Sequence, residues 1–151
     1  MTAPTSPILI CPSCGKPNRV APQNPLTKGR CGACQSTLST GKPVDLTGTT
    51  LSTLLTRDTG RYVIDLWAPW CGPCRMMAPA FTEAAGHFAD QVRFFKLNTE
   101  DHPQAAAQFN IRGIPTLIAY NSGQQAALQS GAMPQPQLFN WIEKSFGLMA
   151  S

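Results

Sequence analysis

From residue 44 to the end of the chain, short apolar runs alternate with segments whose apolar residues recur every three or four positions. The runs are typical of buried strands, and the recurring positions are typical of amphipathic helices. The pattern predicts strands at 44–46, 62–67, 92–97, 116–120 and 125–129, and helices near 51–55, from 74 to 88, at 103–109 and from 138 to 146. The order β-α-β-α-β-α-β-β-α predicts an α/β fold, an open mixed sheet with helices on both faces.

Turn and cap residues mark the ends of these elements. Thr49 and Thr50 are candidate caps for the first helix, which should stop near Gly60. The residues Asn-Ser-Gly at 121–123 predict the turn of an antiparallel hairpin. Gly147 should end the last helix.

Residues 1–40 have a different pattern. They hold few apolar side chains and six prolines, so we expect neither a long helix nor an ordinary core there. The segment Ser-Thr-Gly-Lys-Pro at 39–43 is typical of a linker. The sequence therefore predicts a small domain at 1–40, held together by something other than burial, and a second domain at 41–151.

Charge and composition exclude two classes of function. The 151 residues carry a formal net charge of +4, and no apolar run is long enough to cross a membrane. The excess lies in residues 1–46, where a zinc ion held by four thiolates would lower it to about +2. We therefore expect no membrane or nucleic-acid partner. The first residues do not resemble a secretory signal, so a cytoplasmic location is expected.

Six cysteines form three pairs with the same Cys-x2-Cys spacing. In the first two pairs the spacing Cys-x2-Cys-x16-Cys-x2-Cys is typical of a tetrahedral zinc site. Gly15 and Gly32 fit the tight turns that such a site needs. Thiolate ligation would supply the folding free energy that burial cannot. The predicted metal ligands are Cys11, Cys14, Cys31 and Cys34.

Other interpretations of these four cysteines stay open. They could form two disulfides, remain free thiols, or hold iron in place of zinc. A bound zinc ion could serve structure alone, recognise a partner as a zinc-ribbon binding module, or leave when the thiols are oxidised, as in a redox sensor.

The third pair, Cys71 and Cys74, lies where a buried strand meets a helix, and this place favours redox chemistry. The helix dipole and free backbone N–H groups would stabilise a thiolate on Cys71, and Pro73 is acceptable only in the first turn. Cys71 would attack a substrate disulfide and Cys74 would resolve the mixed disulfide. Asp65, a lone acid in an apolar strand, is the candidate proton acceptor; the alternative is an exposed acid at a strand edge.

These residues resemble a known family. The segment Trp-Ala-Pro-Trp-Cys-Gly-Pro-Cys-Arg at 67–75 is similar to the active-site segment of thioredoxins. Gly-Ile-Pro-Thr at 113–116 resembles the family's cis-proline loop, and Phe-Lys-Leu-Asn at 95–98 resembles the strand whose lysine lies near the buried acid. The resemblance runs from about residue 44 to 147. With the four N-terminal cysteines, the whole chain is similar to the zinc-binding thioredoxin 2 type of bacteria.

The resemblance implies a thioredoxin-like fold and a role for each residue. Cys71 would be the nucleophile, Cys74 the resolving thiol, Asp65 the proton acceptor assisted by Lys96, and Pro115 a cis residue facing the dithiol. The substrate-binding residues it implies are Trp70, Gly72, Pro73, Gly113, Ile114 and Gly131.

The activity implied is that of a protein disulfide reductase with one zinc ion and a redox-active Cys71–Cys74 disulfide. Thioredoxin reductase would supply electrons from NADPH, and the partners would be disulfide-containing proteins such as reductases and peroxide-detoxifying enzymes. A monomer is expected. The Gly-Pro pair between the cysteines resembles the reductant of the family, although a net oxidant or isomerase remains an alternative.

Overall fold

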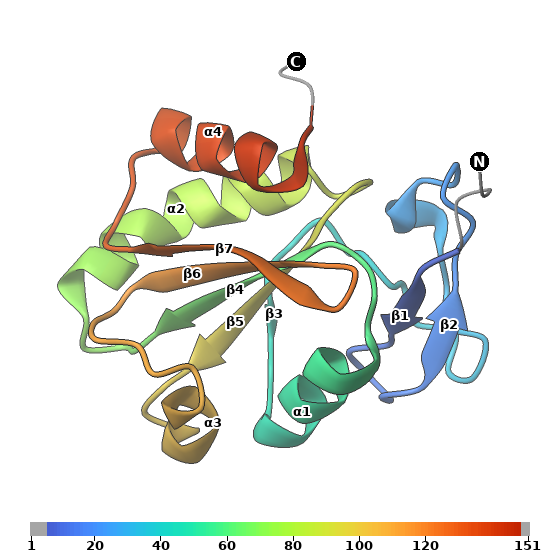
Figure 1. Ribbon diagram of the computed structural model, residues 1–151, viewed down its shortest axis with the longest axis horizontal. Helices are drawn as coiled ribbons and strands as arrows, with labels where there is room; N and C mark the ends of the chain where they lie inside the picture. Colours follow the sequence, from blue (N-terminus) through green and yellow to red (C-terminus); the bar gives the residue numbers. More distant parts are fainter. Residues whose placement is uncertain (1–5, 149–151) are drawn as a thin grey trace.

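The computed structural model describes residues 6–148 and contains a central sheet of five strands (Figure 1). The strand order is β3-β5-β4-β6-β7. The bounds are β3 Val44–Asp45, β4 Tyr62–Trp67, β5 Arg93–Asn98, β6 Thr116–Asn121 and β7 Gln124–Ser130. Strands β3 and β4 pair in parallel with β5, whereas β6 and β7 are antiparallel to their neighbours. The predicted mixed sheet is confirmed.

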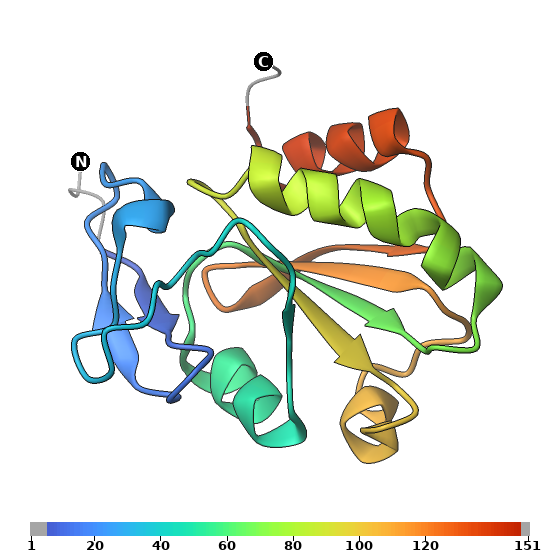
Figure 2. The same cartoon turned by 180° about the vertical axis from the view of Figure 1, so that it is seen from behind.

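Helices cover both faces of this sheet, as predicted. Helices α2, Gly72–His87, and α4, Gln135–Phe146, lie on one face. Helices α1, Gly48–Arg57, and α3, Pro103–Ala107, lie on the other (Figure 2). Each face buries its own apolar cluster, and the residues of the strands point alternately into the two clusters. The fold is therefore the thioredoxin-like α/β fold.

The ends of two elements test the predicted signals. Thr47, and not Thr49 or Thr50, caps α1, because Thr47 alone has extended backbone angles while its hydroxyl accepts a hydrogen bond from the Thr50 N–H at 3.1 Å. The other two threonines lie inside the helix. Gly147 ends α4 with a left-handed φ of 66°, as expected.

The N-terminal segment is more ordered than the sequence predicted. It contains β1, Ile8–Ile10, paired antiparallel with β2, Pro17–Arg19, and a short 3-10 helix η1, Leu26–Lys28. The segment buries only a small cluster, which agrees with the expectation of no ordinary core. Two cysteines belong to this cluster, whose members are Leu9, Cys11, Val20, Cys31 and Leu38.

Residues 39–43, predicted as a linker, are not a free tether. Ser39 is buried, and its hydroxyl donates a hydrogen bond to the carbonyl oxygen of Ala89 at 2.6 Å, just after α2. Strand β1 also packs against α1 (Figure 1). The N-terminal segment is therefore held against the rest of the fold at two places, the end of α2 and helix α1.

Between residues 6 and 148, no helix is both long enough and apolar enough to cross a membrane.

Candidate active site and metal centre

Cys71 and Cys74 form a disulfide at the N-terminus of α2. Cys71 is the N-cap residue, and its Sγ accepts a hydrogen bond from the Cys74 N–H at 3.2 Å. Pro73 occupies the first turn of the helix, where its missing N–H leaves no bond unmade. Both cysteines are buried, with 4% and 3% of their surface exposed. The predicted place of this pair at a helix start is confirmed.

A loop before β6 lies against the disulfide. The Ile114–Pro115 peptide bond is cis, and the Ile114 carbonyl oxygen lies 3.8 Å from the Sγ of Cys71. The Gly131 N–H donates a hydrogen bond to the Pro115 carbonyl at 2.8 Å, which joins the end of β7 to this loop. Gly131 has a φ of 93°, a conformation that L side chains rarely adopt. The structure thus brings residues from α2, the loop and β7 to one place.

The rim of the disulfide is apolar and exposed. Trp70 is 67% exposed and Met76 is 81% exposed, which is unusual for side chains of this size. The other predicted substrate-binding residues also reach the surface: Gly72, Pro73, Gly113 and Gly131 are exposed, and Ile114 is half-buried. From its position off the buried face of the helix, the sequence left two interpretations for Met76, a residue bordering the site or one simply exposed to solvent, and the structure shows it exposed.

Asp65 lies buried in β4, 2% exposed, and its Oδ1 has no hydrogen-bond partner within the described chain. Burial raises the pKa of this carboxyl to about 7, while the positive charge of Lys96 opposes the rise. Lys96 lies opposite Asp65 in the β4–β5 register, with its Nζ 4.1 Å from the centroid of the Trp67 ring. The exposed strand-edge alternative for Asp65 is therefore wrong.

The four N-terminal cysteines meet in space, and their Sγ atoms all lie within 4.8 Å of one another. The Sγ atoms of Cys11 and Cys34 are 3.6 Å apart, and those of Cys14 and Cys31 are 3.5 Å apart. Four sulfurs at about 2.3 Å from a tetrahedral zinc ion would lie about 3.8 Å from each other. The donor set and its spacing fit a zinc ion.

Each cysteine pair lies in a tight backbone turn of the same shape, which we call a knuckle: residues 11–15 and residues 31–35. The Gly15 N–H donates to the Cys11 carbonyl and the Gln35 N–H to the Cys31 carbonyl, both at 2.8 Å. Gly15 has a φ of 79° and Gln35 a φ of 69°. The role predicted for Gly32 was wrong, because the left-handed residue of the second knuckle is Gln35, four positions after the first cysteine of its pair.

Hydrogen bonds around the second pair favour the thiolate form that binds metals. The backbone N–H of Cys34 and the side chain of Asn18 lower the pKa of Cys31 to about 6. Hydrogen bonds from Ser36 lower the pKa of Cys34. The pKa of Cys14 moves the other way: against a backbone hydrogen bond from Lys16, burial and the other three cysteines raise it to about 12. Thiolates held this close repel one another unless a cation lies between them.

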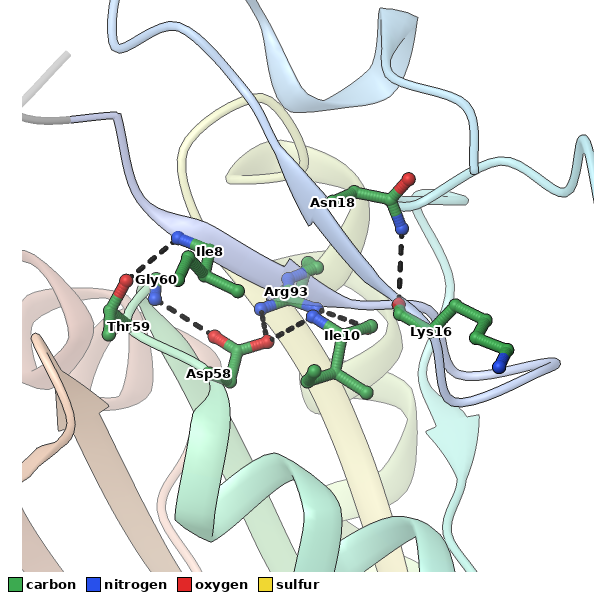
Figure 3. A network of polar contacts seen from close by, with 8 residues as sticks. All are labelled: Ile8, Ile10, Lys16, Asn18, Asp58, Thr59, Gly60 and Arg93. Atoms are coloured by element: carbon green, nitrogen blue, oxygen red, sulfur yellow. Dashed lines mark hydrogen bonds and ion pairs between the residues drawn. The ribbon is translucent and has the colours of Figure 1, made fainter. Parts of the chain in front are cut away.

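A buried ion pair, missed by the sequence reasoning, joins β1 to the central sheet (Figure 3). The Arg93 guanidinium lies 2.5 Å from Asp58 Oδ2, and both side chains are almost fully buried. The same carboxylate accepts a hydrogen bond from the Ile10 N–H, and Arg93 donates to the Ile10 carbonyl. A charged residue in an apolar strand singled out Asp65, and the same signal was present at Arg93.

Comparison with known proteins gives a consistent result. The family model described as Thioredoxin matches residues 42–144. Thioredoxin C-3 of Corynebacterium nephridii is 38% identical over 137 residues, which cover 91% of this chain and 94% of that protein. The thioredoxin of Rhodospirillum rubrum is 45% identical over 86 residues, or 57% of this chain and 83% of that protein.

Solved structures show the same fold. Chloroplastic thioredoxin z superposes with a TM-score of 0.63 at 22% identity, over 70% of this chain and 96% of that one. The thioredoxin of Malassezia sympodialis superposes with a TM-score of 0.59 at 28% identity, over 69% of this chain and 91% of that one. With the helix-start disulfide and the buried carboxyl in place, the chain belongs to the thioredoxin family and is a thioredoxin-type oxidoreductase.

Proposed function

We propose that this protein is a protein disulfide reductase of the zinc-binding thioredoxin 2 type. The observation that carries the proposal is the Cys71–Cys74 disulfide at the start of α2, with the Ile114 carbonyl 3.8 Å from the Sγ of Cys71. A helix N-terminus stabilises a thiolate, and a carbonyl beside it offers a bond to the backbone of an extended substrate.

The reaction transfers two electrons to the substrate in two displacements. In the reduced enzyme the Cys71 thiolate attacks one sulfur of a substrate disulfide, forms a mixed disulfide and expels the first substrate thiolate. The Cys74 thiol then loses its proton and attacks the Sγ of Cys71. The Cys71–Cys74 bond forms as the mixed disulfide breaks, and the second substrate thiolate leaves. The substrate is reduced and the cysteine pair is oxidised.

Asp65 would accept the proton of Cys74. A carboxyl with a pKa raised to about 7 by burial can take a proton near neutral pH and release it again. Lys96, across the strand pair, would limit this rise through its positive charge.

The apolar rim would bind the substrate around its disulfide. Trp70 and Met76 offer exposed apolar surface beside the cysteines, and the half-buried Ile114 continues it. Thioredoxin reductase would return the pair to the dithiol with electrons from NADPH. Other partners would be disulfide-containing proteins, including reductases and peroxide-detoxifying enzymes.

The four-cysteine cluster would hold one zinc ion through Cys11, Cys14, Cys31 and Cys34. Bound there, the metal would supply cross-linking free energy to a segment with a small apolar core. The redox steps above use none of these four sulfurs.

Reduction of insulin disulfides, coupled to NADPH and a bacterial thioredoxin reductase, tests the proposal. Cys71→Ser should abolish turnover, and Cys74→Ser should accumulate a mixed disulfide visible by mass spectrometry because the resolving thiol is gone. Ser52→Ala, exposed on α1 on the opposite face of the sheet, is the control and should leave turnover unchanged. Normal turnover by Cys74→Ser would contradict the two-step scheme.

A further inference from the structure

Asn18 connects the two cysteine knuckles. It lies half-buried on β2, and its Nδ2 donates a hydrogen bond to the Lys16 carbonyl at 3.2 Å (Figure 3). That carbonyl also accepts the Cys11 N–H at 2.9 Å, so it is part of the first knuckle. The Oδ1 of Asn18 accepts the Gly32 N–H at 2.9 Å in the second knuckle. One amide group therefore bonds to the backbone of both halves of the site.

The two knuckles need such a connection. A long stretch of chain, from Gly15 to Arg30, separates their cysteine pairs. The small apolar cluster takes in one cysteine of each turn, Cys11 and Cys31, but neither turn's outer residues. Besides the contacts between the cysteine sulfurs themselves, the Asn18 side chain forms hydrogen bonds to both turns.

The residue type suits the place. The bridge needs one donor for the Lys16 carbonyl and one acceptor for the Gly32 N–H, and an amide offers both. A carboxylate would lack the donor and add a negative charge beside four sulfur ligands. Alanine would leave both backbone groups without this partner, whereas the neutral amide of asparagine satisfies both.

We propose that Asn18 is a positioning residue that sets the metal affinity of the four-cysteine site by holding its two knuckles at the spacing a single metal ion requires. The inference rests on the zinc site of the proposed function. Residues that orient metal ligands through hydrogen bonds typically change the affinity about 10-fold to 100-fold when they are replaced.

The test measures zinc affinity by competition with a chromophoric chelator on the reduced full chain. Asn18→Ala should bind zinc about 10-fold to 100-fold more weakly than the wild type. Asn24→Ala is the matched control, because Asn24 is an exposed asparagine of the same segment with its side chain outside the knuckles. Its affinity should equal that of the wild type.

A second variant breaks the same bond without touching Asn18. Gly32→Pro removes the N–H that Asn18 accepts, and Pro12 already occupies the matching position of the first knuckle. It should weaken zinc binding as Asn18→Ala does. In cobalt-substituted protein, both variants should change the thiolate-to-cobalt absorption bands, which report ligand geometry and not overall folding.

The outcomes separate the two claims. A wild-type chain that binds no zinc would overturn the zinc site and the role of Asn18 together. If the wild type binds zinc and both Asn18→Ala and Gly32→Pro bind it equally tightly, the role of Asn18 alone is overturned. An equal loss in Asn24→Ala would also overturn it, because the effect would not depend on the bridge.

Discussion

The redox pair and the two knuckle pairs share the spacing Cys-x2-Cys but differ in the backbone after the turn. In each pair, the carbonyl of the first cysteine accepts a hydrogen bond from the backbone N–H of the residue four positions later. The donors are Gly15 at 2.8 Å, Gln35 at 2.8 Å and Arg75 at 3.2 Å. Gly15 and Gln35 then take a left-handed φ and end the turn. Arg75 stays helical and α2 continues to His87.

This difference decides the partner of each sulfur. In α2 the helix holds Cys71 and Cys74 close enough to bond with each other, and a helix dipole favours a thiolate on the first. In the knuckles each pair meets the sulfurs of the other pair instead. The spacing alone brings two sulfurs near each other, and the backbone after the turn either continues a helix, as at Arg75, or ends the turn, as at Gly15 and Gln35.

Metal removal should produce the largest contrast between the two centres. Structural zinc contributes roughly 10 kcal/mol or more to small folds. A strong chelator added to the reduced protein should therefore speed amide exchange in residues 11–37 by at least about a thousandfold, while β4 stays protected. Hydrogen-exchange mass spectrometry measures both, with zinc added back as the control. Unchanged protection of residues 11–37 would show that their apolar cluster suffices.

The second contrast is in pH dependence, through Asp65. Its folded pKa is about 7 against 3.8 for the ordinary carboxyl, so the folded state keeps a proton that the unfolded state has lost between these values. Stability from this group therefore falls as the pH rises from about 4 to about 7. The metal site has the opposite trend, because its ligands bind metal as thiolates.

In the oxidised protein, Asp65→Asn removes the cost of keeping an ionised carboxylate buried in the folded state at high pH. The free energy of unfolding should rise by up to about 4 kcal/mol at pH 8 and stay unchanged near pH 4. Urea denaturation at the two pH values measures the difference. The same variant should slow resolution of the mixed disulfide, since it removes the proton acceptor. An equal gain at both pH values would contradict the raised pKa.

The smallest contrast comes from placing glycine at two matched positions, each four residues after the first cysteine of its pair. Gln35→Gly should stabilise the zinc-loaded protein by up to about 1 kcal/mol, because glycine adopts a left-handed φ without the steric cost. Arg75→Gly should destabilise it by about 1 kcal/mol, because glycine is a poor helix residue. Both side chains are exposed, and thermal unfolding of the two variants measures the sign of each change in stability. Changes of the same sign would contradict the proposed difference between the turns.

The sequence predicted the central sheet, its helices and the redox pair, because apolar periodicity and the place of Pro73 report local structure directly. The lone acid in an apolar strand correctly indicated a buried Asp65. The roles of the individual site residues in substrate reduction stay predictions.

The features that the sequence did not predict depend on contacts between distant residues. Because Gly32 is a glycine, the sequence placed the tight turn there. In the structure the residue with the left-handed φ is Gln35, whose N–H closes the turn on the Cys31 carbonyl. The burial of Ser39 depends on a carbonyl 50 residues away, and no local pattern records it. The Asp58–Arg93 pair likewise forms across 35 residues.

The contacts of Ile10 have a consequence for the order in which the protein forms during synthesis. Its backbone bonds to Asp58, 48 residues later, and to Arg93, 83 residues later. At the translation rate of about 5 to 20 residues per second, Arg93 is added roughly 4 to 17 seconds after Ile10. The four clustered cysteines, which end at Cys34, leave the ribosome before either partner. The four-cysteine cluster can therefore form before the surface that docks it has been made.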